Sequence, residues 1–337
     1  YEFTGWSPAV DATMPAQNTV YTATWNALTF NAIFDANGGA WKDGDTSKTV
    51  PTAFDADIKA PSENPEMAGY VFNGWDPEVG TMNNVNGLTY TAKWINATDT
   101  KYTVVTHTMN AEGEYEEKSE IFTGETGAAV NVKPASYAEG FKANDELSTY
   151  EGSILADSSL VLHVYIDRES YNFTTIAGTE TITTPVLYGA TVVMPAEVEK
   201  VGYTFAGWYD GNTKYAAGAS TTMPIGGLTV EAKWTANEVP FKVVVNYTDA
   251  ATGVHAEETE LSGTADYAII FVDEMPEVEA ENTVYIVKGD FAVNHYTLDE
   301  AASDLEGTVA PDGSTVLNLH YTANKYEITF DADTGAF

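Results

Sequence analysis

The sequence has no cysteine, few basic residues and no long apolar run, and each absence removes a class of function. Without cysteine the chain can form no disulfide framework, thiolate nucleophile or Cys-ligated zinc site. Its 337 residues carry 15 Lys and Arg against 50 Asp and Glu, a formal net charge of −35, and Arg168 is the only arginine. Because nucleic acid binding requires phosphate neutralisation, we expect no nucleic acid partner and no attraction to anionic membrane surfaces. No apolar run approaches the roughly 18 residues of a membrane helix, so we expect no membrane insertion within this segment.

What is present is the composition of a folded protein and an internal repeat. Hydrophobic residues make up 44% of the chain, which excludes wholesale disorder. An aromatic-Gly-Trp motif occurs three times, as Phe3-Thr4-Gly5-Trp6, Phe72-Asn73-Gly74-Trp75 and Phe205-Ala206-Gly207-Trp208. Each copy is followed by a methionine and then by a strand-like run that ends in tryptophan. Matched elements in a fixed order define a repeating unit, which we call type A.

A second unit, type B, lies between the type A units. Its copies begin with the β-rich runs 102–105 and 241–245 and end with the similar segments 157–166 and 312–321. The second copy carries an insertion around 273–283 that is absent from the first.

These repeats predict a tandem array. The predicted modules are the C-terminal part of a type A unit (1–26), type A (27–98), type B (99–168), type A (169–237), type B (238–323) and the start of another type A unit (324–337). Since the chain starts and stops inside a repeat, we expect it to be a window from a longer array, with any anchor or signal peptide elsewhere. Linkers of only a few residues predict an extended, semi-rigid rod.

The strand signal is strong throughout. Runs of β-branched and aromatic residues, such as 28–34, end in turn-forming residues. In the run 90–94 a two-residue period places Tyr90, Ala92 and Trp94 on a core face and Lys93 in water. Short helices are predicted over 214–223 and 138–148. The expected fold class is therefore α+β to mostly β, in small modules that depend on dense aromatic packing for stability.

The type A pattern, Gly69 to Trp75 and Gly202 to Trp208 followed by a strand ending in Ala-Lys-Trp, resembles the internalin B-repeat family, also called the Listeria–Bacteroides repeat. Type B resembles the repeats of mucin-binding proteins, mainly at its two ends. These resemblances imply β-grasp, ubiquitin-like modules of secreted or cell-wall-attached bacterial proteins, acting as spacers or weak adhesive elements, with no catalytic motif.

Few residues suggest site chemistry. No HExxH, GxSxG or phosphate-loop pattern occurs, so we expect no enzyme activity, no catalytic or metal site and no cofactor. The histidines are expected on exposed strand faces rather than as metal ligands or catalytic groups. They are His107, His163, His255, His295 and His320.

Two further hypotheses about site chemistry stay open. Acidic clusters could bind calcium, which takes oxygen ligands; they lie at 43–45, 112–117 and 331–335. Intramolecular isopeptide cross-links would need a lysine buried beside a carboxylate. The strand lysines are Lys93, Lys233 and Lys242, and alternation directs all three outward.

The surface allows two further alternatives. Exposed aromatics such as Trp41 and Tyr209 could stack on sugars, although core packing is the simpler interpretation. The acidic charge favours solubility and mutual repulsion along a rod, and a halophilic or acid-adapted origin is the alternative.

Together these features predict a non-catalytic stalk or adhesin segment of a bacterial cell-surface protein, located outside the cell. Two alternatives remain. The repeats could themselves bind host glycans, mucin or proteins, or they could self-associate into a surface filament.

Overall fold

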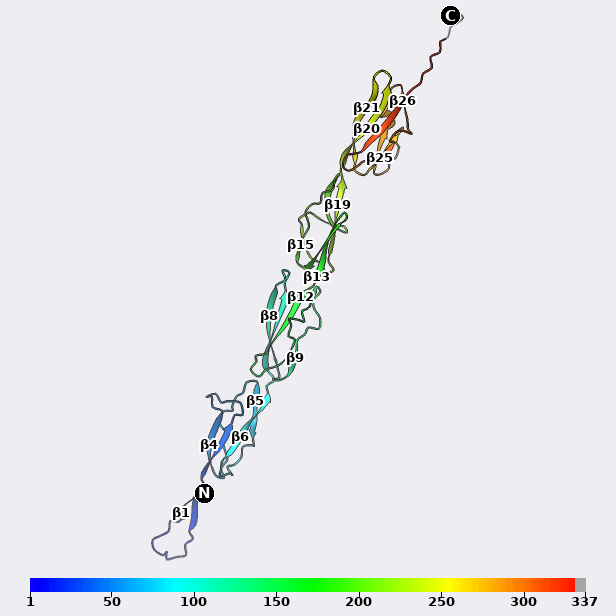
Figure 1. Cartoon of the computed structure of the whole chain (residues 1–337). Coiled ribbons are helices and arrows are strands. Elements are labelled where there is room, and N and C mark those ends of the chain that lie inside the picture. The colour runs from blue at the N-terminus through cyan, green and yellow to red at the C-terminus, as the bar shows by residue number, and fades with distance from the viewer. Residues whose placement is uncertain (331–337) are drawn as a thin grey trace. The chain divides into compact units, whose positions relative to one another are not determined.

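The structure is a computed structural model that describes residues 1–330, and their regular secondary structure is β strands apart from one 3-10 turn (Figure 1). The chain divides into two compact units, the first covering Tyr1–Glu169 and the second starting at Ser170. Each unit is described separately below.

The first unit contains a short hairpin and two modules, A1 (β3 to β6) and B1 (β7 to β12). Its strands are β1 (Glu2–Ser7), β2 (Thr22–Asn26), β3 (Thr29–Asp35), β4 (Ser47–Ala53), β5 (Tyr70–Asp76), β6 (Leu88–Asn96), β7 (Thr100–Met109), β8 (Tyr115–Gly124), β9 (Ala129–Asn131), β10 (Phe141–Ala143), β11 (Glu151–Ser153) and β12 (Val161–Arg168).

The second unit contains modules A2 (β13 to β19) and B2 (β20 to β26). Its strands are β13 (Ser170–Ala177), β14 (Glu180–Leu187), β15 (Thr191–Val193), β16 (Tyr203–Asp210), β17 (Thr213–Tyr215), β18 (Ser220–Thr222), β19 (Leu228–Ala236), β20 (Glu238–Asp249), β21 (Gly253–Thr264), β22 (Ala268–Val272), β23 (Thr283–Val287), β24 (Tyr296–Leu298), β25 (Glu306–Thr308) and β26 (Val316–Ala323). A 3-10 turn, η1 (Lys288–Phe291), follows β23.

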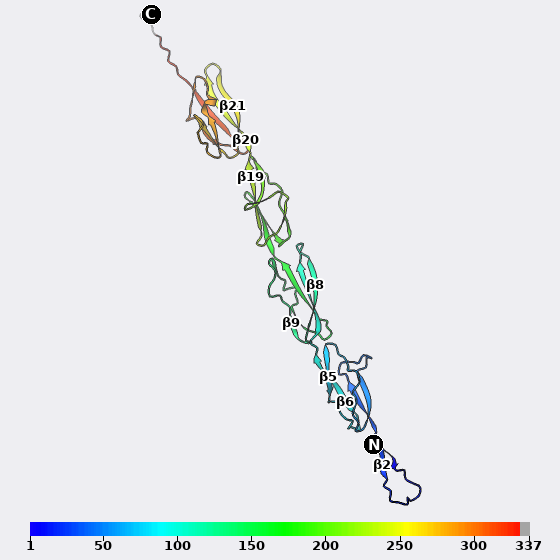
Figure 2. The same ribbon diagram turned by 180° about the vertical axis from the view of Figure 1, so that it is seen from behind.

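All four modules share one sheet order. The orders are β4-β3-β6-β5, β8-β7-β12-β10, β14-β13-β19-β16 and β21-β20-β26-β24, with β17 added beside β16 in A2. In each module the strand that comes first along the chain and the strand that comes last pair in parallel at the centre, and the flanking pairs are antiparallel. Figure 2 shows one such flanking pair, β5 and β6, from behind. Types A and B are therefore variants of one architecture despite their different sequences.

Aromatic and aliphatic side chains fill each core as the two-residue period predicts. In β6, Tyr90 and Ala92 are buried, Trp94 is half-buried and Lys93 is exposed, which confirms the predicted faces. The Trp94 indole N–H donates to the Ala36 carbonyl at 3.1 Å, so the half-buried ring is also fixed by its polar edge. The marker methionines of A1 and A2 lie in these cores as well.

The two predicted helices are wrong. Residues 214–223 hold the end of β17 and all of β18, which pairs with β15. Residues 138–148 hold β10 and its flanking turns, and β10 pairs with β12. The strands in both segments pair with other strands, so their backbone groups bond in sheets rather than within a helix. The α+β expectation is thereby replaced by a nearly all-β fold over residues 1–330.

The hairpin of β1 and β2 keeps its markers exposed. Trp6 and Trp25 are each about half exposed, and Met14 is 95% exposed. Phe3 packs edge-to-face against both tryptophans. A two-stranded hairpin has no second layer of structure to cover its side chains, so its aromatic residues contact one another but stay partly exposed.

Candidate functional site

The joint between modules A1 and B1 is built from backbone hydrogen bonds. The carbonyl of Gly69, in the turn before β5, accepts the backbone N–H of Ala97 at 2.9 Å and the hydroxyl of Thr126 at 2.6 Å. The Ala97 carbonyl in turn accepts the backbone N–H of Thr126 at 2.9 Å. The Thr126 hydroxyl also lies 2.7 Å from that of Thr100, and both threonines are buried. A turn of A1, the linker and a turn of B1 are therefore held together.

The joint between A2 and B2 repeats this arrangement with different side chains. The carbonyl of Gly202 accepts the backbone N–H of Asn237 at 2.9 Å, and the Asn237 carbonyl accepts that of Ala265 at 2.9 Å. The hydroxyl of Tyr203 donates to the carboxylate of Asp266. Repetition of the backbone pattern in two dissimilar sequences indicates a specific joint rather than a flexible linker.

Both joints require glycine. Gly69 and Gly202 have φ values of +75° and +77°, a region that L side chains rarely adopt. A Cβ on Gly69 would lie 2.5 Å from the Cα of Ala156, and one on Gly202 would lie 2.5 Å from the carbonyl oxygen of Pro311. The type B loops that precede β12 and β26 thus press directly on these two glycines.

Each of those loops is closed by an aspartate. Asp157 Oδ1 accepts the hydroxyl of Ser159 at 2.6 Å and its backbone N–H at 3.1 Å, and Asp312 accepts the same pair of bonds from Ser314 at 2.6 and 3.0 Å. The serine hydroxyl bond, followed by the backbone bond, holds the pKa of each aspartate below its ordinary value. Ionised aspartate therefore maintains the loop that contacts the joint glycine.

The most distinctive side-chain cluster lies on the face of the B1 sheet that carries His107. His107 Nε2 lies 2.9 Å from His163 Nδ1, so the two rings share one hydrogen bond across the central strands. The His107 ring stacks on Tyr165 with centroids 3.9 Å apart, and its Nδ1 lies 3.2 Å from a carboxylate oxygen of Glu117. Only 4% of His107 is exposed, which makes the prediction of an exposed histidine wrong at this position. His163 is half-buried, whereas His320 is exposed as predicted.

A carboxylate extends this cluster. Asp167 accepts hydrogen bonds from the Tyr115 hydroxyl and from the side-chain amide of Asn144, the latter at 3.0 and 3.2 Å. Burial raises the pKa of Tyr115, and the bond to Asp167 raises it further. Tyr115 therefore stays a neutral donor, and the cluster is a set of satisfied hydrogen bonds with stacked rings.

Module B2 keeps the position of this central pair but changes the residues. There Asn246 Nδ2 donates to Asn318 Oδ1 at 3.4 Å, at the positions of His107 and His163 in the sheet register. A cross-strand polar pair is therefore common to both type B modules, whereas only in B1 are both of its members histidines. The shared element is structural, because asparagine supplies neither a base nor a nucleophile at neutral pH.

The remaining predicted site residues take structural positions. Trp41 is buried in the A1 core, with its indole N–H donating to the Glu63 carbonyl at 2.8 Å, so it presents no surface for a sugar. Tyr209 is half-buried beneath Lys233, whose Nζ lies 4.8 Å from the ring centroid. Lys93, Lys233 and Lys242 are exposed, as alternation predicts.

The acidic clusters bond within the chain. Asp43 and Asp45 both form ion pairs with Lys48, the latter at 3.0 Å. Within residues 1–330 no group of three or more histidines and carboxylates is placed to hold a metal ion. The third predicted cluster, 331–335, lies outside the described residues. Over that same described range, no helix has the length and apolar character needed to cross a membrane.

Comparison with known proteins supports the type A assignment. Residues 30–112 and 170–233 match the family model of the Listeria-Bacteroides repeat domain. The matched segments contain nearly all of A1 and A2, and the first continues into the first hairpin of B1. Joint glycines Gly69 and Gly202 therefore lie within the two segments that match this family model, while their contacts Ala156 and Pro311 lie outside them.

Two relatives come from the bacterium Evansella cellulosilytica. One, named "Putative Gly-rich membrane protein", is 23% identical over 271 residues, which cover 70% of this chain and 31% of the relative. Another, named "Putative membrane protein", is 27% identical over 235 residues, which cover 64% of this chain and 33% of the relative. The chain thus matches about one third of the length of these curated relatives.

Proposed function

We propose that this chain is a non-catalytic stalk or adhesin segment of a bacterial cell-surface repeat protein, exposed outside the cell. The observation that carries the proposal is the repeated joint, in which a glycine carbonyl, the linker and a type B turn are bonded in the same order twice. A short linker that is hydrogen-bonded to both neighbouring modules fixes the orientation of one module relative to the next. A spacer needs this property.

Other observations support a surface role. The Listeria-Bacteroides repeat segments alternate with type B modules, and both relatives carry membrane-protein names. A net charge of −35 opposes aggregation between neighbouring stalks. In this proposal the modules are β-grasp-like, since their mixed sheets have a parallel central pair, and they form an extended rod.

Small-angle X-ray scattering tests the rod directly. A compact globule of this length has a radius of gyration of about 20 Å, and the proposal requires a much larger value at constant monomer mass, with or without calcium. A radius of gyration close to that of the globule would contradict the stalk, and a mass that grows with protein concentration would favour the filament alternative.

A second candidate function is ligand binding by the type B modules, whose sequences resemble mucin-binding repeats. The polar face of B1 favours it, because the half-buried rings of His163 and Tyr165, with centroids 6.5 Å apart, lie beside the half-buried, hydrogen-bonded carboxylate of Asp167. Immobilised mucin and deglycosylated mucin, tested against the whole chain, would distinguish glycan recognition from a purely structural face.

A further inference from the structure

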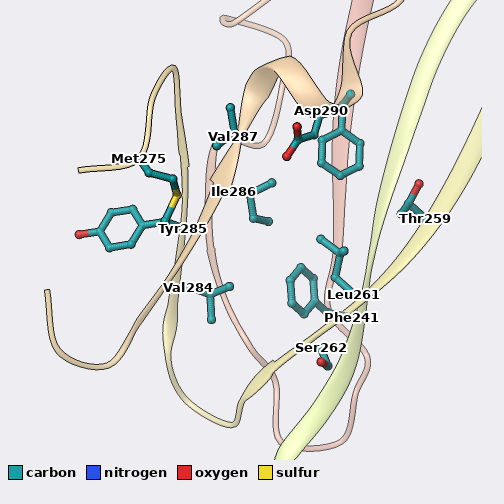
Figure 3. A pocket seen from close by; sticks show the side chains of 11 residues that line it. Phe241, Thr259, Leu261, Ser262, Met275, Val284, Tyr285, Ile286, Val287 and Asp290 are labelled. Carbon is teal, nitrogen blue, oxygen red and sulfur yellow. The ribbon is translucent and has the colours of Figure 1, made fainter. Parts of the chain in front are cut away.

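Module B2 contains a groove between two strand edges. β21 is the outer strand of the main B2 sheet, and β23 is the outer strand of the second sheet, β23-β22-β25. A cavity of about 670 Å³ lies between them, lined by Thr259 and Leu261 from β21, by the strand 284–287, and by Phe241 and Phe291. Figure 3 shows Val284 and Ile286 on one side of this groove and Phe241 and Leu261 on the other.

The groove results from the insertion in B2. The chain between β22 and β25 runs from 273 to 305, whereas the chain between the equivalent strands of B1, β9 and β11, runs only from 132 to 150. The additional chain forms β23, which pairs in parallel with β22 over 283–287. In B1 the corresponding sheet has only β9 and β11. The β23 edge that borders the groove is therefore a feature of B2 that B1 lacks.

Strand β21 presents different chemistry on its two faces. Leu261 and Thr259 pair with Phe241 and Val243, both of which are buried, so these side chains face the core and the groove. Glu260 and Glu258 pair with Lys242 and Val244 on the opposite face. There Lys242 Nζ lies 2.8 Å from a carboxylate oxygen of Glu258, whereas Glu260 forms no ion pair within residues 1–330. A strand added beside β21 would place alternate side chains in the apolar groove and the others beside these glutamates.

The negative charge around the groove favours a positively charged ligand. Residues 253–290 contain ten carboxylates and one lysine, Lys288, which already pairs with Asp273 and Glu300. Asp290 lines the groove itself. A second copy of this acidic chain would be repelled, whereas a cationic segment would be attracted.

We propose that the groove between β21 and β23 binds an extended cationic peptide of a partner protein as an added strand beside β21. Apolar residues of the peptide occupy the groove, and its Lys or Arg residues at alternate positions face Glu258 and Glu260. Main-chain hydrogen bonds to the open edge supply affinity, and the two rows of side chains supply specificity. The proposal is independent of the stalk function, since it concerns one groove in one module.

The first test uses the whole chain and four capped heptapeptides. The probe is Lys-Val-Lys-Val-Lys-Val-Lys. One control peptide carries Glu in place of every Lys. In the other two controls alternate backbone amides are N-methylated, those of the Lys residues in one peptide and those of the Val residues in the other. Isothermal titration calorimetry at physiological ionic strength should show binding of the probe and at least tenfold weaker binding of the Glu peptide and of one N-methylated peptide. No binding of the probe, or equal binding of the probe and both N-methylated peptides, would overturn strand addition.

A matched pair of variants separates the groove from general charge attraction. Glu258→Lys with Glu260→Lys should weaken probe binding at least tenfold. Glu112→Lys with Glu114→Lys makes the same charge change at exposed positions of B1, which lacks the β23 strand, and should leave binding unchanged. If both double variants weakened probe binding equally, the interaction would be non-specific charge attraction, and the proposal would be overturned. Backbone amide shifts confined to 257–262 and 283–287 would place the peptide in the groove, and shifts elsewhere would contradict that placement.

Discussion

The hydroxyl of Tyr203, the first residue of β16, donates to the carboxylate of Asp266 in the turn that follows β21. Tyr1 has the same relation to Asp55, at 2.8 Å. Asp266 follows β21, the second strand of B2, and Asp55 follows β4, the second strand of A1. Both aspartates have positive φ values, +64° and +60°. In B1 the equivalent residue is Gly127, with φ of +81°. The shared feature of the joints is thus the backbone turn, and the tyrosine contact is added where the turn carries an aspartate.

The glycine of the second joint should not tolerate a side chain. Gly202→Ala places a Cβ 2.5 Å from the Pro311 carbonyl oxygen at a positive φ, and the backbone strain alone costs about 1–2 kcal/mol. The joint amides of Asn237 and Ala265 should therefore exchange with deuterium roughly 5- to 30-fold faster. Gly211→Ala is the control, because Gly211 also has a positive φ, +55°, but a Cβ there meets open space. Unchanged exchange in Gly202→Ala would contradict the joint.

Acid should loosen both joints. The pKa values of Asp157 and Asp312 are lowered in the folded state, so their stabilisation is present above the unfolded pKa of about 3.9 and is lost as pH falls through the folded values. Asp157→Asn with Asp312→Asn should flatten the acid limb of the pH dependence of joint amide exchange. Substituting the exposed Asp11 and Glu112 by their amides serves as control and should leave the profile unchanged. An identical profile in the aspartate variant would mean that these carboxylates do not support the joint.

The polar pair of B2 provides a template for the polar face of B1. His163→Val should leave the buried Nε2 of His107 without its partner, at a cost of about 1–3 kcal/mol. The double variant His107→Asn with His163→Asn should recover part of that loss, because Asn246 and Asn318 form the equivalent pair in B2. Hydrogen exchange of the β7 and β12 amides measures both locally. A double variant less stable than His163→Val would show that the imidazole stacking on Tyr165 matters more than the shared hydrogen bond.

The sequence predicted what depends on local alternation and missed what depends on distant partners. The faces of Tyr90, Ala92 and Lys93 follow from the two-residue period of a strand alone. His107 became buried because His163 and Tyr165, from the far end of the module's sequence, lie beside it, and no local pattern carries that information. The joints are formed by hydrogen bonds between backbone carbonyls and amides, which every residue type can supply. The glycine of the Gly-Tyr pair is therefore the part of a joint that can be recognised in the sequence.

The insertion in B2 illustrates the same limit at the groove. Its position was evident from comparing the two type B copies, yet the sequence did not show that the extra residues pair in parallel with β22. The strand 283–287 is rich in β-branched and aromatic residues, so its strand character was accessible. Its partner and the open edge beside Leu261 were set by the tertiary fold.

A single substitution decides between the two interpretations of Trp41. As a buried residue stacked near Trp75, with ring centroids 6.1 Å apart, it should behave as core, so Trp41→Ala should cost module A1 about 3–5 kcal/mol. Hydrogen exchange of β3 and β6 measures this locally, which is necessary because a multi-module chain does not unfold in one step. Tyr209→Ala, at a half-buried surface ring, is the comparison and should cost A2 clearly less. If Trp41→Ala instead left A1 stable and abolished binding to a sugar ligand, the ring would be a recognition surface and the core assignment would be wrong.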